Sequence, residues 1–319
     1  MGETAPDLVA RLAKGVREQV GRAVVGKQEA VDLCMVAVLC GGHILIQDVP
    51  GIGKTTLAKA LARALGCSFK RIQFTPDLTP ADVLGVSIYS QRTGEFVFQP
   101  GPVFAQVLLA DEINRATPRT QSALLEAMQE RQVTVDGVSH PLPQPFLVIA
   151  TQNPIEMEGT FPLPEAQLDR FMLRVHLGYP SLEEEVEVLA LGSRAGQVEQ
   201  VEAVALPDAL LAATREVERV RVDESIRRYV VHLGQATRSH EALTLGASPR
   251  ALLALYRGAQ ALAALHGRDF VTPDDVKALV LPVLAHRLLL TGQARLRGRT
   301  TEAVLQEVLN RVPVPLEPG

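Results

Sequence analysis

Residues 44–62 read Ile44-Leu45-Ile46-Gln47-Asp48-Val49-Pro50-Gly51-Ile52-Gly53-Lys54-Thr55-Thr56-Leu57-Ala58-Lys59-Ala60-Leu61-Ala62. An apolar strand, a glycine-bearing loop that ends in Gly-Lys-Thr, and a helix follow one another, as in sites that hold nucleotide phosphates. Gly51 and Gly53 allow the backbone to curl so that its N–H groups point at phosphate oxygens. Lys54 adds a mobile positive charge at a helix N-terminus, and Thr55 offers a hydroxyl to Mg²⁺. The stretch therefore predicts a site for a nucleoside triphosphate.

The first position of this loop departs from the usual pattern. A strict Gly-x-x-x-x-Gly-Lys-Thr motif has glycine where this chain has Asp48. The tip of the loop is intact, so we expect the residues around it to bind the nucleotide. They are Pro50, Gly51, Ile52, Gly53, Lys54, Thr55 and Thr56. An ordinary strand, turn and helix without a ligand is the alternative interpretation.

The composition is typical of a globular protein. The chain has 319 residues, of which 47% are apolar and 21% charged. A formal net charge of −4 argues against a broad nucleic-acid surface, so a nucleic-acid partner is not expected. No apolar run reaches the length of a membrane span, so we expect no membrane insertion. Apolar residues at Leu8, Leu12, Val16 and Val20 predict an amphipathic N-terminal helix and not a signal peptide, and hence a cytoplasmic protein.

Strand-like runs alternate with helical patterns over the first half of the chain. The predicted strands are 43–47, 69–74, 107–110, 146–151 and 172–177, and the predicted helices are 28–39, 54–65, 118–130 and 164–170. This alternation predicts an α/β fold, in which a mostly parallel sheet is sandwiched by helices and binds ligands beyond the carboxyl ends of its strands. Two predicted hairpins, at 86–98 and 131–140, interrupt the alternation.

The strand-like runs end near residue 180, and helical patterns follow. The predicted helices are 207–220, 224–239, 249–266, 273–287 and 301–311. Ser248 and Thr272 each precede a proline, a pairing typical of a capped helix start. A glycine-containing link near 192–206 is the expected domain boundary. The chain is thus predicted to have an α/β nucleotide-binding domain at 1–195 and a smaller all-α domain at 196–319.

Polar residues follow two of the buried strands. Asp111 is placed to hold Mg²⁺, and Glu112 to face the terminal phosphate, where a carboxylate orients or deprotonates a water. Asn153 follows a later strand, where its amide is able to hydrogen-bond both the water and the phosphate. A solvated pair of charges is the alternative for the acids, and a turn before Pro154 is the alternative for Asn153.

Two arginines are candidates for contacts with phosphate. Arg170 ends a short helix, where a cation interacts favourably with the helix dipole. The functional alternative is an arginine finger that reaches a neighbouring subunit's nucleotide. Arg250 lies in the first turn of a helix, where a cation is unfavourable without a partner. A γ-phosphate across the interdomain cleft would be such a partner. A further cluster, Arg295, Arg297 and Arg299, is expected on a solvated surface, with a phosphate or acidic-protein contact as the alternative.

Four stretches resemble motifs of the MoxR family of AAA+ ATPases. They are Asp48-Val49-Pro50-Gly51-Ile52-Gly53-Lys54-Thr55, Leu109-Ala110-Asp111-Glu112-Ile113-Asn114-Arg115-Ala116, Ala150-Thr151-Gln152-Asn153-Pro154-Ile155-Glu156 and Gly159-Thr160-Phe161-Pro162-Leu163-Pro164-Glu165-Ala166-Gln167-Leu168-Asp169-Arg170-Phe171. The similarity runs from about Val25 to Arg299. It implies the P-loop NTPase fold of AAA+ proteins followed by an α-helical lid domain, and the binding and hydrolysis of ATP with Mg²⁺. The hairpins at 86–98 and 131–140 match the family's insertion in helix 2 and its pre-sensor hairpin.

The resemblance also implies roles for single residues. Lys54 and Thr55 would belong to Walker A, Asp111 and Glu112 to Walker B, Asn153 would be sensor 1, Arg170 the arginine finger and Arg250 sensor 2. The segment Val25-Gly26-Lys27 looks like the one whose backbone meets adenine. The family forms homo-oligomeric rings, often hexamers, and remodels or activates partners with von Willebrand factor A domains, so we expect a chaperone-like ATPase of this kind.

Other functions remain open at this point. A nucleic-acid-dependent ring motor shares this sheet and both hairpins, but the chain is acidic and poor in lysine and aromatic residues. A metal-chelatase motor subunit also resembles the chain, and would need a second chain to bind metal and macrocycle. Glu112 argues against a nucleotide switch that does not hydrolyse. A dinucleotide-binding oxidoreductase is excluded, because Lys54, Thr55 and Thr56 follow Gly53 and the third glycine is missing.

Overall fold

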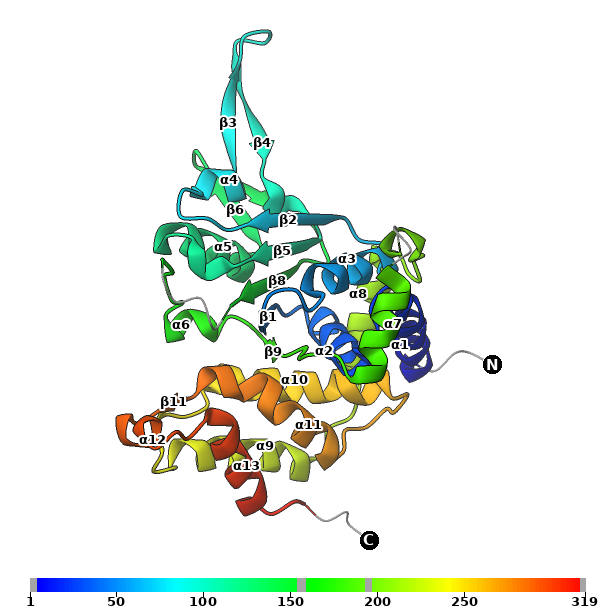
Figure 1. The fold of residues 1–319 in the computed structure, drawn as a ribbon, viewed down its shortest axis with the longest axis vertical. Coiled ribbons are helices and arrows are strands. Elements are labelled where there is room, and N and C mark those ends of the chain that lie inside the picture. The colour runs from blue at the N-terminus through cyan, green and yellow to red at the C-terminus, as the bar shows by residue number, and fades with distance from the viewer. Residues whose placement is uncertain (1–4, 154–158, 193–196, 316–319) are drawn as a thin grey trace.

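The computed structural model describes residues 5–153, 159–192 and 197–315. A five-stranded sheet lies at the centre of the first part (Figure 1). In spatial order its strands are β2 (Phe69–Gln73), β5 (Val107–Asp111), β8 (Leu147–Gln152), β1 (Ile44–Gln47) and β9 (Leu173–Val175). Neighbouring strands all pair in parallel, which confirms the five predicted strands and the parallel sheet.

Alternate side chains of β1, β5 and β8 enter two separate hydrophobic cores. Ile44 and Ile46 of β1 belong to one core, and Leu45 belongs to the other. The first core contains helices α1 (Ala5–Gly21), α2 (Gln28–Leu39) and α3 (Lys54–Ala64), and the second contains α5 (Pro118–Glu130). Helices therefore cover both faces of the sheet, as predicted. Leu12, Val16 and Val20 of α1 are buried, which confirms the amphipathic N-terminal helix.

Both predicted hairpins are present. The first consists of β3 (Gly85–Ser90) and β4 (Glu95–Pro100), which follow the short helix α4 (Pro80–Leu84) and project away from the sheet (Figure 1). The second consists of β6 (Gln132–Val135) and β7 (Val138–Pro141). Asp136 and Gly137 join its strands with φ angles of 51° and 80°, the left-handed conformation that a two-residue hairpin turn requires.

The rest of the described chain is mainly helical. Its helices are α6 (Glu165–Leu168), α7 (Leu182–Gly192), α8 (Pro207–Val217), α9 (Glu224–Arg238), α10 (Pro249–Leu265), α11 (Pro273–Leu284), α12 (Gly292–Leu296) and α13 (Thr301–Arg311). The predicted caps are confirmed, because the side chains of Ser248 and Thr272 accept hydrogen bonds from the first turns of α10 and α11. The expectation of no strands after residue 180 was wrong in one place, where β10 (Leu243–Leu245) pairs with β11 (Leu289–Leu290). These two strands are too short to give a periodic sequence signal.

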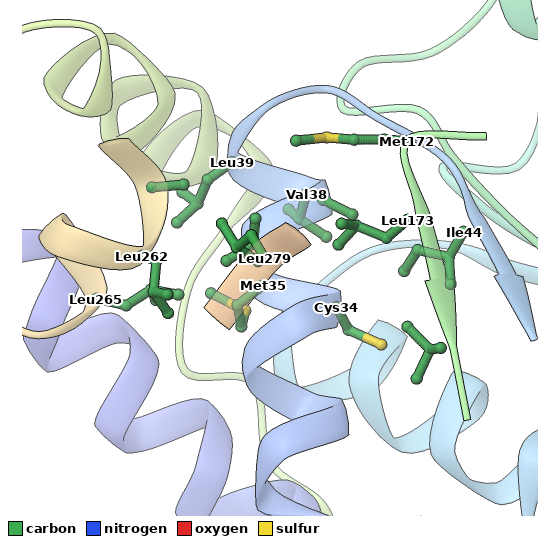
Figure 2. Packing of buried hydrophobic residues seen from close by; sticks show 14 of the residues in the cluster. Cys34, Met35, Val38, Leu39, Ile44, Met172, Leu173, Leu262, Leu265 and Leu279 are labelled. Atoms are coloured by element: carbon green, nitrogen blue, oxygen red, sulfur yellow. The ribbon is translucent and has the colours of Figure 1, made fainter. Parts of the chain in front are cut away.

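Helix α2 links the sheet to the C-terminal helices. Figure 2 shows Met35 and Val38 of α2 between Ile44 and Leu173 of the sheet and the C-terminal helices. A single hydrophobic core therefore runs from the sheet into α10 and α11. The predicted division into 1–195 and 196–319 stays a prediction; α8, which follows it, packs against α1 and α2. No helix in the described residues is long and apolar enough to cross a membrane.

Candidate active site

The loop between β1 and α3 has the shape that its glycines predicted. Gly51 and Gly53 have φ angles of 86° and 90°, in the left-handed region that side chains disfavour. A Cβ built on either glycine has no neighbour within 4 Å, so the loop faces open space. Helix α3 begins at Lys54, whose Nζ donates to the backbone carbonyl of Asp48 at 2.7 Å. The loop thus presents backbone amides, a helix N-terminus and a lysine to one cavity.

Two neighbouring cavities open onto this loop. The smaller has a volume of about 410 Å³ and is lined by Lys54, Asp111, Glu112 and Asn153, among others. The larger has a volume of about 820 Å³ and is lined by Val25 and by residues of α7. Both share the loop residues Pro50, Gly51, Gly53, Thr55 and Thr56, and Ile52 lines the larger one. Together they form one elongated site with a charged, polar end and a more apolar end.

Asp111 ends β5 and is held by two partners. Its Oδ1 accepts a hydrogen bond from the Thr151 hydroxyl at 2.6 Å, and its Oδ2 accepts from Arg71 Nη2 at 2.7 Å. The Thr151 hydroxyl also accepts from the backbone N–H of Glu112 at 2.8 Å. Thr151 is fully buried on β8, so it fixes the carboxylate of Asp111 and the backbone of Glu112. The guanidinium of Arg71 balances the charge of the Asp111 carboxylate.

Glu112 has an unusual backbone conformation that turns the chain at the strand end. Its φ and ψ angles are 56° and 50°, a region that costs a non-glycine residue free energy and is common at functional sites. Its Oε2 accepts hydrogen bonds from Gln73 Nε2 at 2.6 Å and from Arg115 Nη1 at 3.1 Å. The carboxylate therefore lines the cavity while two donors hold one of its oxygens.

Lys54 and Arg71 are the cations that line the smaller cavity. Burial lowers the pKa of the Lys54 ammonium group, and the carboxylates of Asp111, Asp48 and Glu112 act in the opposite direction. Asn153 is buried beside this group, at the end of β8. The structure therefore brings Lys54, Thr55, Asp111, Glu112 and Asn153 to one place, as the sequence predicted.

The residues of this cavity fit a magnesium-bound triphosphate. The two glycines leave space against the loop, and Lys54 and the helix N-terminus supply positive charge for phosphate oxygens. Thr55 and Asp111 supply the oxygens of the predicted metal site. The described residues contain no group of three or more His, Cys, Asp and Glu side chains that could hold a metal ion.

The segment before α2 contributes to the larger cavity in part. Val25 and Lys27 line it, whereas Gly26 lines a separate cavity beside Arg174 and Glu302. Gly26 has a φ angle of 69°, and a Cβ there would overlap with the carboxylate of Glu184. This glycine thus lets the segment pass close to α7, which forms part of the wall of the larger cavity.

Arg170 and Arg250 lie apart from this site. Met172 N donates to the carbonyl of His43, which precedes β1, so Arg170 lies near the amino-terminal edge of the sheet. The phosphate loop follows β1 at the opposite edge. Arg170 Nη1 donates to the carbonyl of Leu125 at 2.7 Å, and Arg250 Nη1 lies 4.0 Å from Asp169 Oδ2. Both arginines line one hollow of about 310 Å³, and the structure does not bring Arg250 to the phosphate cavity of its own chain.

The arginine cluster near the C-terminus lies on and after α12. Arg299 Nη2 donates to Glu307 Oε1 at 2.5 Å. Arg295 and Arg297 are exposed and flank Leu296, whose exposed fraction is 91%. The exposure agrees with the expected solvated surface. Arg299 in addition forms an ion pair with Glu307 of α13.

Sequence reasoning missed three residues that hold the acids. Arg71 and Gln73 of β2 contact Asp111 and Glu112, and Thr151 of β8 contacts both. A signal was present, because residues 71 and 73 share a face of a predicted strand that precedes the acidic strand. In the structure Gln73 is the direct neighbour of Asp111 in the β2–β5 pairing.

Comparisons with known proteins agree with the fold. A family model described as the ATPase family associated with various cellular activities (AAA) matches residues 43–173, and a model of the AAA lid domain matches 235–308. The first range contains the loop and both acids, and the second contains most of the C-terminal helices. The protein is therefore an AAA+ ATPase with a lid domain, a class that binds nucleotide.

The relatives place the chain within this class. Chaperone MoxR1 of Mycobacterium tuberculosis is 45% identical over 311 residues, which cover 93% of this chain and 81% of that protein. YeaC of Bacillus subtilis is 50% identical, covering 98% and 97%. A crystal structure of a proposed ATPase from Cytophaga hutchinsonii has a TM-score of 0.92 at 40% identity, covering 98% and 97%. The chain belongs to the MoxR family of AAA+ ATPases.

Proposed function

We propose that this protein hydrolyses ATP with Mg²⁺ as a homo-oligomer in which each subunit completes the active site of its neighbour. The proposal depends on one observation. Lys54 and Glu112 lie at the carboxyl ends of the parallel strands, and Arg170 and Arg250 lie near the amino ends. An arginine at the far edge does not reach the phosphates of its own chain. A second copy placed with this edge against the phosphate loop brings both arginines to the nucleotide.

Each residue then has a separate task. Backbone amides of the loop and Lys54 hold the β- and γ-phosphates, and Thr55 and Asp111 hold Mg²⁺. Bound Mg²⁺ neutralises charge that develops on the phosphate oxygens. Glu112 orients and deprotonates the attacking water, and Asn153 hydrogen-bonds the water or the γ-phosphate. Arg170 and Arg250 of the neighbour stabilise the transition state, a contribution of about 10³–10⁵ in rate for an arginine finger.

The larger cavity is the proposed site of the adenosine. Its lining includes Val25 of the segment before α2 and Val188 and Leu189 of α7, which suits an apolar base. The shared loop residues join this cavity to the phosphate site, so one ATP spans both.

Mixed oligomers test the shared active site. Lys54→Ala removes phosphate binding but leaves Arg170, whereas Arg170→Ala binds ATP but supplies no arginine. Each variant alone is expected to lose nearly all turnover. Mixing them at equal amounts restores intact sites at about a quarter of the interfaces of a randomly mixed ring. Turnover of phosphate is measured, and mixed assembly is checked by native mass spectrometry.

A matched control shows whether recovered ATP turnover requires the Arg170 side chain or only the mixing of two variants. Arg170→Ala mixed with the double variant Lys54→Ala, Arg170→Ala forms the same mixed rings, but no subunit supplies the arginine. No recovery is expected. Equal turnover in this mixture and in the test mixture would refute action in trans and leave Arg170 as a residue that binds the carbonyl of Leu125.

We further propose that ATP turnover drives remodelling or activation of a protein partner. The hairpin β3–β4 supports a protein contact, because Tyr89, Phe96 and Val97 on it are 54%, 73% and 52% exposed. The resemblance and the chaperone relative favour a partner with a von Willebrand factor A domain and a hexameric ring.

Glu112→Gln, held in ATP, is expected to retain such a partner on affinity capture. Phe96→Ala in the same background is expected to weaken capture without affecting ATP binding, and equal capture would argue against the hairpin.

A further inference from the structure

Asp48 contacts two parts of the active site at once. Its Oδ2 accepts hydrogen bonds from the backbone N–H of Leu177 at 2.6 Å and of Gly178 at 3.0 Å. Its backbone carbonyl accepts from Lys54 Nζ at 2.7 Å. The residue that replaces the usual glycine therefore ties the phosphate loop to the segment that follows β9.

These two amides need an acceptor that the sheet does not supply. The ladder between β1 and β9 ends at the pair Ile46–Val175, because β1 then turns into the phosphate loop. Leu177 and Gly178 lie beyond that last pair. The carboxylate supplies the acceptor, and hydrogen bonds to a charged oxygen are stronger than those to a neutral one.

The tied segment forms a wall of the larger cavity. Tyr179 and Pro180, directly after the two amides, line it. The same segment is held at a second point, where Lys27 Nζ donates to the Tyr179 carbonyl at 3.3 Å. Lys27 itself lines the cavity, so both attachments fix the wall against the proposed adenosine site.

We propose that Asp48 is a positioning residue. It holds the wall that Tyr179 and Pro180 form at a fixed place relative to the phosphate loop. With this wall in place, the adenosine part of the ligand contributes to the affinity for ATP. This inference rests on the proposed binding of ATP across both cavities. Glycine at position 48 keeps the loop tip and the carbonyl that holds Lys54. It releases the wall and removes one of the three carboxylates that act on the Lys54 ammonium group.

The test compares two ligands on Asp48→Gly. Dissociation constants are measured by calorimetry for ATP and for inorganic tripolyphosphate, both with Mg²⁺. ATP is expected to bind about tenfold more weakly than to the unsubstituted protein, whereas tripolyphosphate changes by less than about twofold. The KM for ATP is expected to rise with little change in kcat. Equal losses for both ligands would overturn the inference, since Asp48 would then act on the phosphate loop alone.

A conservative variant tests the hydrogen bonds themselves. Asp48→Asn keeps an oxygen that accepts from both amides, so its preference for ATP over tripolyphosphate is expected to lie close to that of the unsubstituted protein. Loss as large as that of Asp48→Gly would contradict the role of these bonds. This variant also keeps the test open if the glycine variant does not fold.

Hydrogen exchange gives a direct readout of the wall. In Asp48→Gly the amides of a peptide covering residues 173–181 are expected to exchange faster than in the unsubstituted protein, while a peptide from α5 is unchanged. Unchanged exchange at 173–181 would overturn the inference. A different result, no binding of ATP to the unsubstituted protein, would refute the proposed function itself.

Discussion

Arg287 Nε donates to Asp169 Oδ1 at 2.8 Å, and this contact joins the lid to the residue beside Arg170. The Arg287 side chain is 3% exposed and lies in the turn after α11. It also donates to the carbonyls of Phe171 and Met172. The shared core around α2 adds to this junction (Figure 2). The lid and the sheet edge that carries Arg170 therefore form one unit.

Removal of Asp169 leaves a buried positive charge without its carboxylate. Asp169→Ala is expected to lower the free energy of unfolding by about 3 kcal/mol, as for other buried ion pairs that lose one partner. Urea denaturation measures this change. The control is Asp274→Ala, because Asp274 is 88% exposed and pairs with Lys277 on the surface. Its effect is expected to stay below about 0.5 kcal/mol, and equal effects for both variants would contradict the buried role of Asp169.

Thr151 is expected to tune magnesium binding through Asp111. Thr151→Val removes the hydroxyl that donates to Asp111 and accepts from Glu112 N–H, leaving the Asp111 carboxylate and the Glu112 backbone less well held. The Mg²⁺ concentration for half-maximal ATP turnover is expected to rise about tenfold, in line with the cost of losing a buried hydrogen bond to a charged group. Thr151→Ser keeps the hydroxyl and is expected to behave like the unsubstituted protein. A valine variant with an unchanged magnesium requirement would show that Thr151 does not position Asp111.

Gln73 is expected to restrain Glu112. Its amide donates to the carboxylate of Glu112 at 2.6 Å, and that bond competes with the water that the carboxylate has to orient. Gln73→Ala is therefore expected to raise ATP turnover at saturating ATP by about two- to fivefold. Gln306→Ala, on the exposed face of α13, is the control. Slower turnover in Gln73→Ala would mean that this amide instead holds Glu112 in its productive position.

The sequence predicted well what depends on local order along the chain. The strands β1, β5 and β8 are apolar runs buried on both faces, so each run is a strong signal. Because parallel strands place their carboxyl ends at one edge, Lys54, Asp111 and Asn153 were predicted together and are found together.

The sequence predicted less well what depends on packing between distant segments. The partner of Arg250 is Asp169, from a different part of the fold, and no periodic pattern marks such a pair. The contacts of Asp48 with Leu177 and Gly178 depend on β9 lying beside β1, which strand prediction alone does not specify. Arg71 and Gln73 were missed because β2 is mostly exposed at these positions, and their sequence pattern is that of ordinary surface residues.

His43 is expected to make the fold sensitive to acid. Its Nδ1 accepts from Val148 N–H and its Nε2 donates to the Met128 carbonyl, so the neutral ring fills both bonds. Burial lowers its pKa from 6.5 to about 4. The unfolded chain therefore binds a proton between these values while the folded chain does not, and stability falls as the pH drops through this range. The expected loss from His43 alone is about 2 kcal/mol between about pH 7 and pH 5.

Urea denaturation at the two pH values measures this loss, and the variant His43→Gln tests its source. Glutamine does not titrate in this range and is able to donate and accept at the same two partners. The difference in unfolding free energy between the two pH values is expected to shrink by about 2 kcal/mol relative to the unsubstituted protein. His232→Gln is the matched control, because His232 is exposed on α9. Burial also lowers the pKa of His286 well below its usual value, so part of the acid sensitivity is expected to remain in His43→Gln. A variant that loses as much stability as the unsubstituted protein would show that His43 is not the source.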